Sequence, residues 1–300
     1  MHLNTEDEIT FMQGVSFIKK RLKIIVLFTS IIFIFSIIYA LFQPNIYRSS
    51  GIYEIADSNE SSSPIEAQGL SSIAGAVGVS LGKPSSNKSD VIIETIKSKG
   101  FLLHLLNIEG VFPSLFAIDY YDPQSQKIIL DQSLYSKNKW TNGIPSIHQA
   151  HLIYEKSISI RRDNKDGFIY IHFAHQSPYF AEEFLSLIVS EINATMRVKA
   201  AKESSKSIKF LTEEFTETNW LEIRNSISSL LQKQFETQMI ANVREEYALK
   251  PIESPFVEED KFSPSRLSIV LWWTLGSLII SIMIAFFVEA FRYLEDKNTS

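Results

Sequence analysis

The sequence predicts an α+β domain that contains a very long helix and is flanked by two transmembrane helices. Three observations carry this prediction. Two uncharged apolar segments lie near the ends of the 300-residue chain, short segments of alternating polarity lie between them, and 72 residues without glycine or proline separate Pro178 from Pro251. Alternation is typical of strands, whereas glycine and proline disfavour a helix interior. The mean hydropathy of +0.03 is therefore an average over apolar ends and a polar middle.

Each apolar segment is long enough to cross a bilayer. Residues 24–42 number nineteen and residues 267–288 number twenty-two, and neither segment contains a charged residue. A helix needs about 20 apolar residues to cross a hydrocarbon core of roughly 30 Å. We therefore expect two transmembrane helices. The first apolar run is longer than the core of a signal peptide and follows a long charged leader, which favours an uncleaved anchor.

Basic residues predict the orientation of the chain. Lys19, Lys20, Arg21 and Lys23 directly precede the first span, while only Arg48 lies close to its far side. Cytoplasmic flanks carry the excess of Lys and Arg, so the N-terminus is predicted to be cytoplasmic, and a second span returns the C-terminus to that side. The expected order is a cytoplasmic tail (1–23), a span (24–42), a periplasmic domain (43–266), a span (267–288) and a cytoplasmic tail (289–300).

Small residues recur at a spacing of four within both spans. Ser277, Ser281 and Ala285 share one face of the second span, and Ser36 and Ala40 share one face of the first. Such faces let helix backbones approach closely in lipid. They indicate helix pairing within or between subunits, although Ser and Ala are common enough in spans for the spacing to arise by chance. The uncharged spans offer no ion or proton path.

The segment between the spans combines strands with helices. Residues 45–56, 156–162 and 168–175 alternate and predict a small sheet, the last two joined by a turn at 164–167. Ser89 is expected to cap a helix that begins at Asp90 and runs through the leucines up to Leu106. These elements precede the glycine-free run.

The glycine-free run predicts a long helix over about 178–250. Pro178 behind Ser177 is a typical helix start, and apolar residues continue at helical spacing. Unbroken, such a helix would be on the order of 100 Å long. The apolar stripe changes phase near Thr218-Asn219-Trp220, so a break is expected there. The prolines of residues 251–264 then predict a stiff extended connector to the second span.

No motif indicates catalysis or a cofactor. The glycine-rich loop at 78–84 has three residues between its glycines and proline where a phosphate loop needs Ser or Thr. The chain has no cysteine, and its net charge of −5 gives no basic footprint for nucleic acid. Asp119 and Asp122 flank aromatic residues in what is predicted to be a loop. We therefore expect no enzyme, no cofactor and no nucleic-acid partner.

Histidines form two His-x-x-His pairs that could be read as metal ligands. The pairs are His148 with His151 and His172 with His175. Metal binding needs convergent imidazoles, and two residues three apart on a strand point to opposite faces. Neither cysteine nor a suitably spaced carboxylate assists them. Ordinary polar positions are therefore predicted, without a metal.

In this layout the sequence resembles the Wzz-type polysaccharide co-polymerases, the chain-length determinants of bacterial O-antigen and related glycans. A basic flank and span come first, followed by a tyrosine-containing strand after Pro44. The remaining segments resemble the family in the same order along nearly the whole chain. They are TIKSKGFLLHLL (95–106), the long-helix segment 177–215 with Ala181 and Asn193, and the proline-rich approach 244–266 with Pro251, Pro255 and Pro264, followed by Gly276.

The resemblance implies an inner-membrane protein that is not an enzyme and that forms a homo-oligomeric ring. It would act with a Wzy-type polymerase to set the chain length of lipopolysaccharide O-antigen, with the growing glycan chain and membrane lipid as further contacts. The class without a kinase domain is expected, because only about a dozen residues follow Val288. The residues that the resemblance and the small-residue spacing single out for the connector and for transmembrane packing are Pro251, Pro255, Pro264, Gly276, Ser277, Ser281 and Ala285.

Other functions remain open from the sequence. A co-polymerase or export partner for capsule or exopolysaccharide, working with a separate kinase, shares the layout. A two-span sensor would need a cytoplasmic signalling module, and both predicted tails are short for one. A structural adaptor of an efflux system usually has a single anchor, whereas this chain has two predicted spans.

Overall fold

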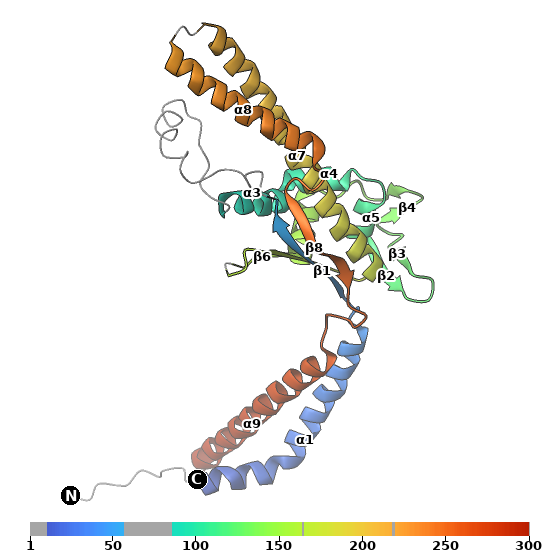
Figure 1. Ribbon diagram of the computed structural model, residues 1–300. Helices are drawn as coiled ribbons and strands as arrows, with labels where there is room; N and C mark the ends of the chain where they lie inside the picture. The colour runs from blue at the N-terminus through green and yellow to red at the C-terminus, as the bar shows by residue number, and fades with distance from the viewer. Residues whose placement is uncertain (1–10, 57–85, 164, 218–219, 300) are drawn as a thin grey trace, which may run out of the picture. The chain divides into compact units, whose positions relative to one another are not determined.

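The computed structural model describes residues 11–56, 86–163, 165–217 and 220–299. The chain divides into two compact units. One unit consists of the two terminal segments, up to Asn45 and from Phe262, and the other runs from Ile46 to Lys261. The α+β class with two terminal apolar helices is confirmed (Figure 1). The glycine-rich loop at 78–84 lies outside the described residues.

A four-stranded antiparallel sheet forms the base of the larger unit. Its order is β6-β7-β1-β8. The strands are β1 (Tyr47–Ile55), β6 (Ile158–Arg162), β7 (Ile169–His175) and β8 (Leu249–Val257). The three strands predicted from alternation are confirmed, and β8 is an addition that the sequence did not indicate.

One face of this sheet carries the core. Successive residues of β7 alternate between buried and half-buried, so Ile171 and Phe173 point to the same side. The first half of α7 (Pro178–Glu217) covers that side, with Phe184 and Ile188 almost fully buried. The rings of Phe173 and Phe184 lie 4.8 Å apart, so strand and helix are in direct contact. α6 (Ile147–Ser157) adds the fully buried Tyr154 to the same cluster.

The helix predicted from Asp90 is instead two helices, α3 (Ser86–Lys97) and α4 (Lys99–Leu106). The break falls at Ser98, whose Oγ accepts a hydrogen bond from the backbone N–H of Phe101 at 3.1 Å. A side chain that caps a new helix also competes with the continuation of the old one. Ser89, the predicted cap, lies inside α3, where it is buried and accepts a hydrogen bond from Arg162.

The predicted loop around Asp119 and Asp122 is wrong, because this region forms a strand. After α5 (Val111–Phe116) the chain makes two small hairpins. Asp122 organises the first turn by accepting from the Gln124 backbone N–H at 3.0 Å and from the Ser125 hydroxyl at 2.7 Å. The hairpin strands are β2 (Ile118–Asp122), β3 (Lys127–Leu130), β4 (Tyr135–Ser136) and β5 (Lys139–Trp140).

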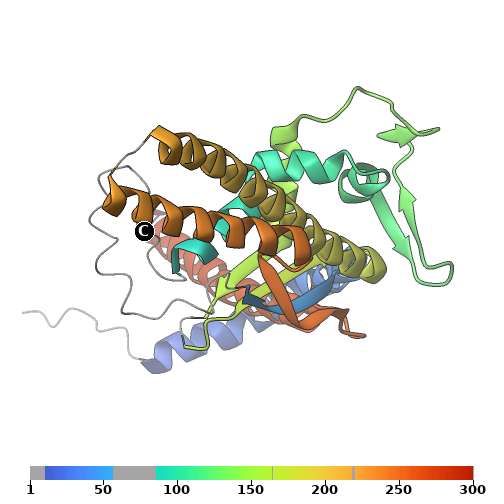
Figure 2. The same ribbon diagram turned by 45° about the horizontal axis from the view of Figure 1, so that its top comes forward.

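The predicted helix over 178–250 is wrong in extent, because the chain reverses. α7 has 40 residues and ends at Glu217, and α8 (Leu221–Val243) has 23 and returns alongside it (Figures 1 and 2). The break expected near 218–220 is confirmed. Antiparallel pairing is shown by the Gln238 side chain donating to the Ser205 hydroxyl at 2.7 Å and by the Arg224 guanidinium lying 4.5 Å from the centre of the Phe215 ring. A reversal lets each helix cover part of the other's apolar stripe.

The smaller unit is a pair of helices, α1 (Phe11–Phe42) and α9 (Arg266–Thr299), which pack against each other. Residues 22–42 and 266–288 are long and apolar enough to cross a membrane. Most of their large apolar side chains are exposed, Phe42 to 85% and Trp272 to 73%. A core helix of a water-soluble protein would bury such side chains, so this exposure favours helices that face lipid.

Candidate functional site

A buried asparagine joins the long helix to the last strand. Asn193 of α7 is 6% exposed, and its amide nitrogen donates to the backbone carbonyl of Leu249 at 2.9 Å. Its amide oxygen accepts from the backbone N–H groups of Ala248 and Leu249 at 2.7 and 2.8 Å. Both of those residues are fully buried. One side chain therefore satisfies three backbone groups where the chain leaves the helical hairpin and enters β8.

Two of the candidate prolines lie inside β8, so the first half of the stiff extended connector predicted over 251–264 is a strand of the sheet. Pro251 pairs with Tyr53 of β1, and the register of the β1–β8 pair is irregular between Ser50 and Tyr53. Pro255 lies in the same strand, which is at an edge of the sheet. Proline is accepted at an edge or a bulge because its missing N–H is not needed there. Pro264 follows the strand and stands just before α9.

The small residues of the spans lie where α1 and α9 pack. Ser277 and Ser281 of α9 are 3% and 4% exposed, and Ser36 and Ala40 of α1 are 1% and 2% exposed. The three serine hydroxyls donate to carbonyls of their own helices, at 2.7 to 2.8 Å. They therefore enter the helix pair without an unsatisfied polar group. Two further candidates, Gly276 and Ala285, are half-buried.

An arginine ties the two spans together at one end. Arg266, the first residue of α9, donates from Nε to the carbonyl of Ala40 at 3.1 Å and from its terminal nitrogen to the Asn45 side chain at 3.0 Å. The carbonyls in the last turn of α1 have no partner within their own helix, and a cation is favourable at that end of the helix dipole. Beside this end the rings of Tyr39 and Trp273 lie 6.1 Å apart. Tyrosine and tryptophan are enriched where spans meet the membrane–water interface.

Replacing Arg266 by alanine is expected to loosen this end of the helix pair. The chain has no native cysteine, so spin labels on cysteines at the exposed positions Leu41 and Leu271 report the separation without background. We expect a broader distance distribution by double electron–electron resonance in nanodiscs. Arg266→Lys should broaden it less, because a lysine can still reach one acceptor. Identical distributions in all three proteins would contradict the role of Arg266.

The histidines are placed as ordinary polar residues. His148 and His151 lie on helix α6, where His151 bonds to the carbonyl of Lys97 at 2.7 Å. His172 bonds to the Ser50 hydroxyl at 2.9 Å. His175 is 7% exposed, bonds through Nε2 to the Ser114 carbonyl and accepts at Nδ1 from the Ser177 N–H, both at 3.1 Å. Among the described residues no group of His, Cys, Asp and Glu could hold a metal ion.

Acid is expected to destabilise the larger unit through His175. Burial lowers the pKa of His175 from 6.5 to about 4, although the bond to the Ser114 carbonyl acts in the opposite direction. The unfolded chain takes up a proton below pH 6.5, while the folded chain does so only near pH 4. Stability is therefore lost as the pH falls through this window, by about 2 kcal/mol between pH 7 and pH 5.

The measurement is chemical unfolding of the full chain in detergent micelles at pH 7 and pH 5. His175→Gln cannot titrate and should lose less stability over the same interval than the wild type does. Equal losses in the two proteins would show that other groups carry the acid sensitivity.

The helical hairpin leaves many apolar side chains uncovered. In α7 the core contacts end near Asn193, and beyond that residue only Ser204 is buried among the described residues of this helix. In α8 only Ile227 and Ala241 are buried. Large apolar side chains that are 48% to 80% exposed follow both helices and the turn between them. They are Val198, Phe210, Trp220, Leu221, Ile223, Phe235, Met239 and Val243.

Comparison with known proteins found matches among solved structures. No protein-family model and no curated protein matches the chain. The chain resembles polysaccharide co-polymerases. A full-length bacterial polysaccharide co-polymerase matches at 10% identity with a TM-score of 0.41, over 96% of this chain and 99% of that one. A fragment of WzzB, a polysaccharide co-polymerase from Salmonella Typhimurium, matches at 10% identity with a TM-score of 0.33, over 73% of this chain and 100% of the fragment.

The candidate residues are divided between the two units. Pro251 and Pro255 belong to the larger unit, whereas Pro264 and the residues of α9 belong to the smaller one. In the sequence, Asn193 is visible only as part of a segment that resembles the co-polymerases. Its role as a clamp, the side chain that bonds α7 to the start of β8, is not indicated there. The partners of Asn193 lie 55 and 56 residues further along the chain, so no local pattern could have indicated them.

Proposed function

We propose that this chain is an inner-membrane polysaccharide co-polymerase that regulates the chain length of lipopolysaccharide O-antigen or a related surface glycan together with a Wzy-type polymerase. The order of resembling segments along nearly the whole sequence carries this proposal. Two apolar helices that expose their side chains fit an anchored protein whose middle segment, 43–266, is periplasmic. The protein acts as a regulator rather than an enzyme, with both termini in the cytoplasm.

Assembly into a homo-oligomer is part of the proposal, and the exposed side chains of the α7–α8 hairpin support it. Two helices that pack only on each other bury one stripe each and leave the rest in water. Exposed apolar surface on this scale is typical of protein interfaces. Further copies of the chain would cover it.

The test of the proposal is deletion of the gene in its host followed by separation of the lipopolysaccharide on a gel. We expect the modal band of the ladder to disappear and to return when the intact chain is supplied. An unchanged ladder would contradict the O-antigen form of the proposal. The size profile of capsule or exopolysaccharide, measured by gel filtration in the same strains, then decides whether another glycan is regulated.

Substitution of Gly276 is expected to change the length distribution without disturbing the pairing of α1 and α9. A Cβ atom built at Gly276 meets no atom within 4 Å, so a side chain can begin at this position without a clash. Ser277→Leu is the matched control, because Ser277 is buried between the spans and a larger side chain there should separate them. We expect an altered ladder with an unchanged oligomer mass for Gly276→Leu, and loss of oligomer for Ser277→Leu.

Pro255 offers the corresponding test in the larger unit. Pro255→Ala restores an N–H on the edge strand without removing a core side chain, so the fold should be retained. The ladder is expected to shift while native mass spectrometry finds the wild-type oligomer. If both Gly276→Leu and Pro255→Ala give the wild-type ladder, the second span and its approach serve only as an anchor.

A further inference from the structure

Three tyrosines from distant parts of the chain lie together at one end of the sheet. Tyr47 begins β1, Tyr121 lies in β2, and Tyr179 lies in the first turn of α7. The rings of Tyr121 and Tyr179 are 6.5 Å apart and tilted by 49°. Tyr47 pairs across the sheet with His175, shortly before α7 begins, which brings the first and third tyrosines to the same corner. We call these residues the tyrosine corner.

The tyrosine corner is accessible and polar. Tyr179 is 52% exposed, and Tyr47 and Tyr121 are half-buried. The pKa of Tyr121 is raised, first by partial burial and then by Tyr179, Tyr47 and Asp122, so these groups are close enough to act on one another. The corner therefore presents three aromatic rings that each carry a hydroxyl group.

This chemistry fits a sugar better than a lipid surface. Surfaces that enter a bilayer carry Trp, Phe and Leu beside Lys and Arg. The three rings of the corner all carry hydroxyl groups, and Asp119 and Asp122 of β2 offset the cations Arg48 and Lys127 that lie next to Tyr47 and opposite Asp122. Tyrosine offers an apolar face and a polar tip, and carboxylates accept hydrogen bonds. A pyranose ring has the matching surface, because its C–H face can pack on an aromatic ring while its hydroxyl groups donate.

We infer that the tyrosine corner binds a short segment of neutral glycan. Tyr121 and Tyr179 would pack on sugar rings, and their hydroxyl groups would form hydrogen bonds with sugar hydroxyls. The inference rests on the proposed function only for the source of the glycan. It adds the surface by which this chain would hold the polymer.

The test uses the full chain in nanodiscs and a defined probe. The probe is the surface polysaccharide of the host, released with mild acid and fractionated to short oligomers. Saturation-transfer difference NMR gives the Kd of these oligomers. We expect Tyr179→Ala and Tyr121→Ala each to raise the Kd by about tenfold, and Tyr179→Phe to raise it only slightly, because the aromatic contact is retained.

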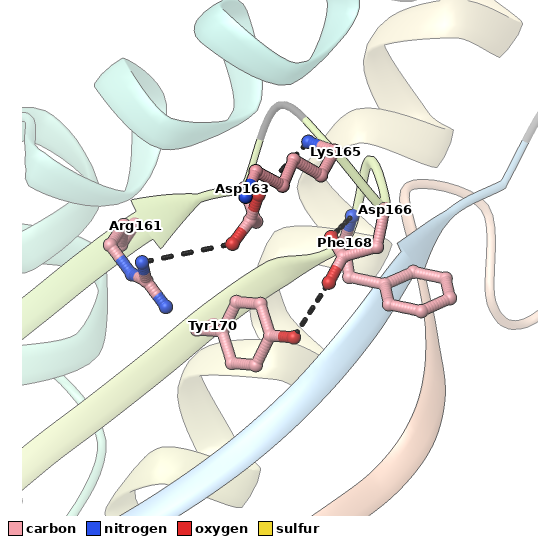
Figure 3. A network of polar contacts seen from close by, with 6 residues as sticks. All are labelled: Arg161, Asp163, Lys165, Asp166, Phe168 and Tyr170. Atoms are coloured by element: carbon pink, nitrogen blue, oxygen red, sulfur yellow. Dashed lines mark hydrogen bonds and ion pairs between the residues drawn. The ribbon is translucent and has the colours of Figure 1, made fainter.

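Tyr170→Ala is the matched control. Tyr170 lies in β7 of the four-stranded sheet, and its hydroxyl donates to an acidic residue, Asp166, at 2.8 Å. It lies beside the β6–β7 turn rather than at the tyrosine corner (Figure 3). Arg161 lies 5.1 Å from the centre of its ring. This variant should bind the oligomers with the wild-type Kd.

Absence of binding to the wild type, or equal Kd values for all variants, would overturn the inference. A bilayer contact would also overturn it, and would appear as quenching of a fluorophore on Tyr179→Cys by lipids brominated in their acyl chains. The gel ladder is a separate readout. An unchanged ladder after deletion together with tyrosine-dependent binding would reject the proposed function and keep the glycan surface. A changed ladder without such binding would do the reverse.

Discussion

Asn193→Leu is expected to lower the free energy of unfolding by about 3 kcal/mol or more. The leucine leaves the N–H groups of Ala248 and Leu249 and the carbonyl of Leu249 without their partner, in a place that water does not reach. Each buried backbone group that loses its hydrogen bond costs about 1–3 kcal/mol, and partial relaxation reduces the sum. Chemical unfolding of the full chain in detergent micelles measures the difference.

Ser204→Ala is the control on the same helix. Ser204 is also buried, at 2% exposure, but its hydroxyl donates only to the carbonyls of Ala200 and Ala201 in its own helix. Those carbonyls keep their helical partners when the hydroxyl is removed, so a change within about 0.5 kcal/mol is expected. Similar losses in the two variants would mean that Asn193 does not clamp β8.

Gly51→Ala is expected to lower the free energy of unfolding by about 2–3 kcal/mol, slightly less than Asn193→Leu. Gly51 lies in β1 beneath the side chain of Tyr53, two residues further along the same face. A Cβ atom at Gly51 would overlap the Tyr53 hydroxyl and lie 2.8 Å from Cζ of that ring. Tyr53 is fully buried and packed, so the ring cannot move aside without disturbing the core.

Two further variants separate this overlap from a general effect of removing glycine. In a Tyr53→Leu background the added cost of Gly51→Ala should fall below about 1 kcal/mol, because the shorter side chain vacates the space. Gly100→Ala, in α4, meets nothing within 4 Å and should be neutral or slightly stabilising. A cost for Gly51→Ala that does not depend on residue 53 would contradict the overlap.

The spans and the three-stranded core of the sheet were predictable because their signals are local. Nineteen uncharged residues at 24–42 show the length of a span without any knowledge of the rest of the chain. The alternation of 168–175 likewise identifies β7 by itself. The break after Glu217 was also signalled locally, by a change of phase in the apolar stripe, but the reversal of the chain at this break was not.

The missed elements depend on partners that are far away or on weak local signals. β8 contains Pro251 and Pro255, which argue against a strand until its place at a sheet edge is known. The hairpin β4–β5 has two-residue strands around Lys137 and Asn138, both with positive φ, and it is held by the ring of Trp140, 4.8 Å from that of Phe112. Such a contact leaves no periodic pattern in the sequence.

The candidate site was predictable only in part, for the same reason. The spacing of Ser277 and Ser281 identifies a close-packing face, but it does not name the opposing helix. The tyrosine corner was not indicated at all, because Tyr47, Tyr121 and Tyr179 are brought together by the pairing of β1 with β7 and by the start of α7. Single aromatic residues in three separate elements have no signature of their own.

The clamp at Asn193 makes the helical hairpin a closed insertion. The chain leaves the sheet-bound part of α7 at Asn193 and returns to the same side chain at Ala248, so the two ends of the intervening segment are held together. Lengthening or shortening the segment between these two ends changes the free energy of closing it only slightly, since loop-closure entropy changes slowly with length. Such a protein can vary its hairpin in evolution, or accept one from a relative in the laboratory, while the sheet stays the same.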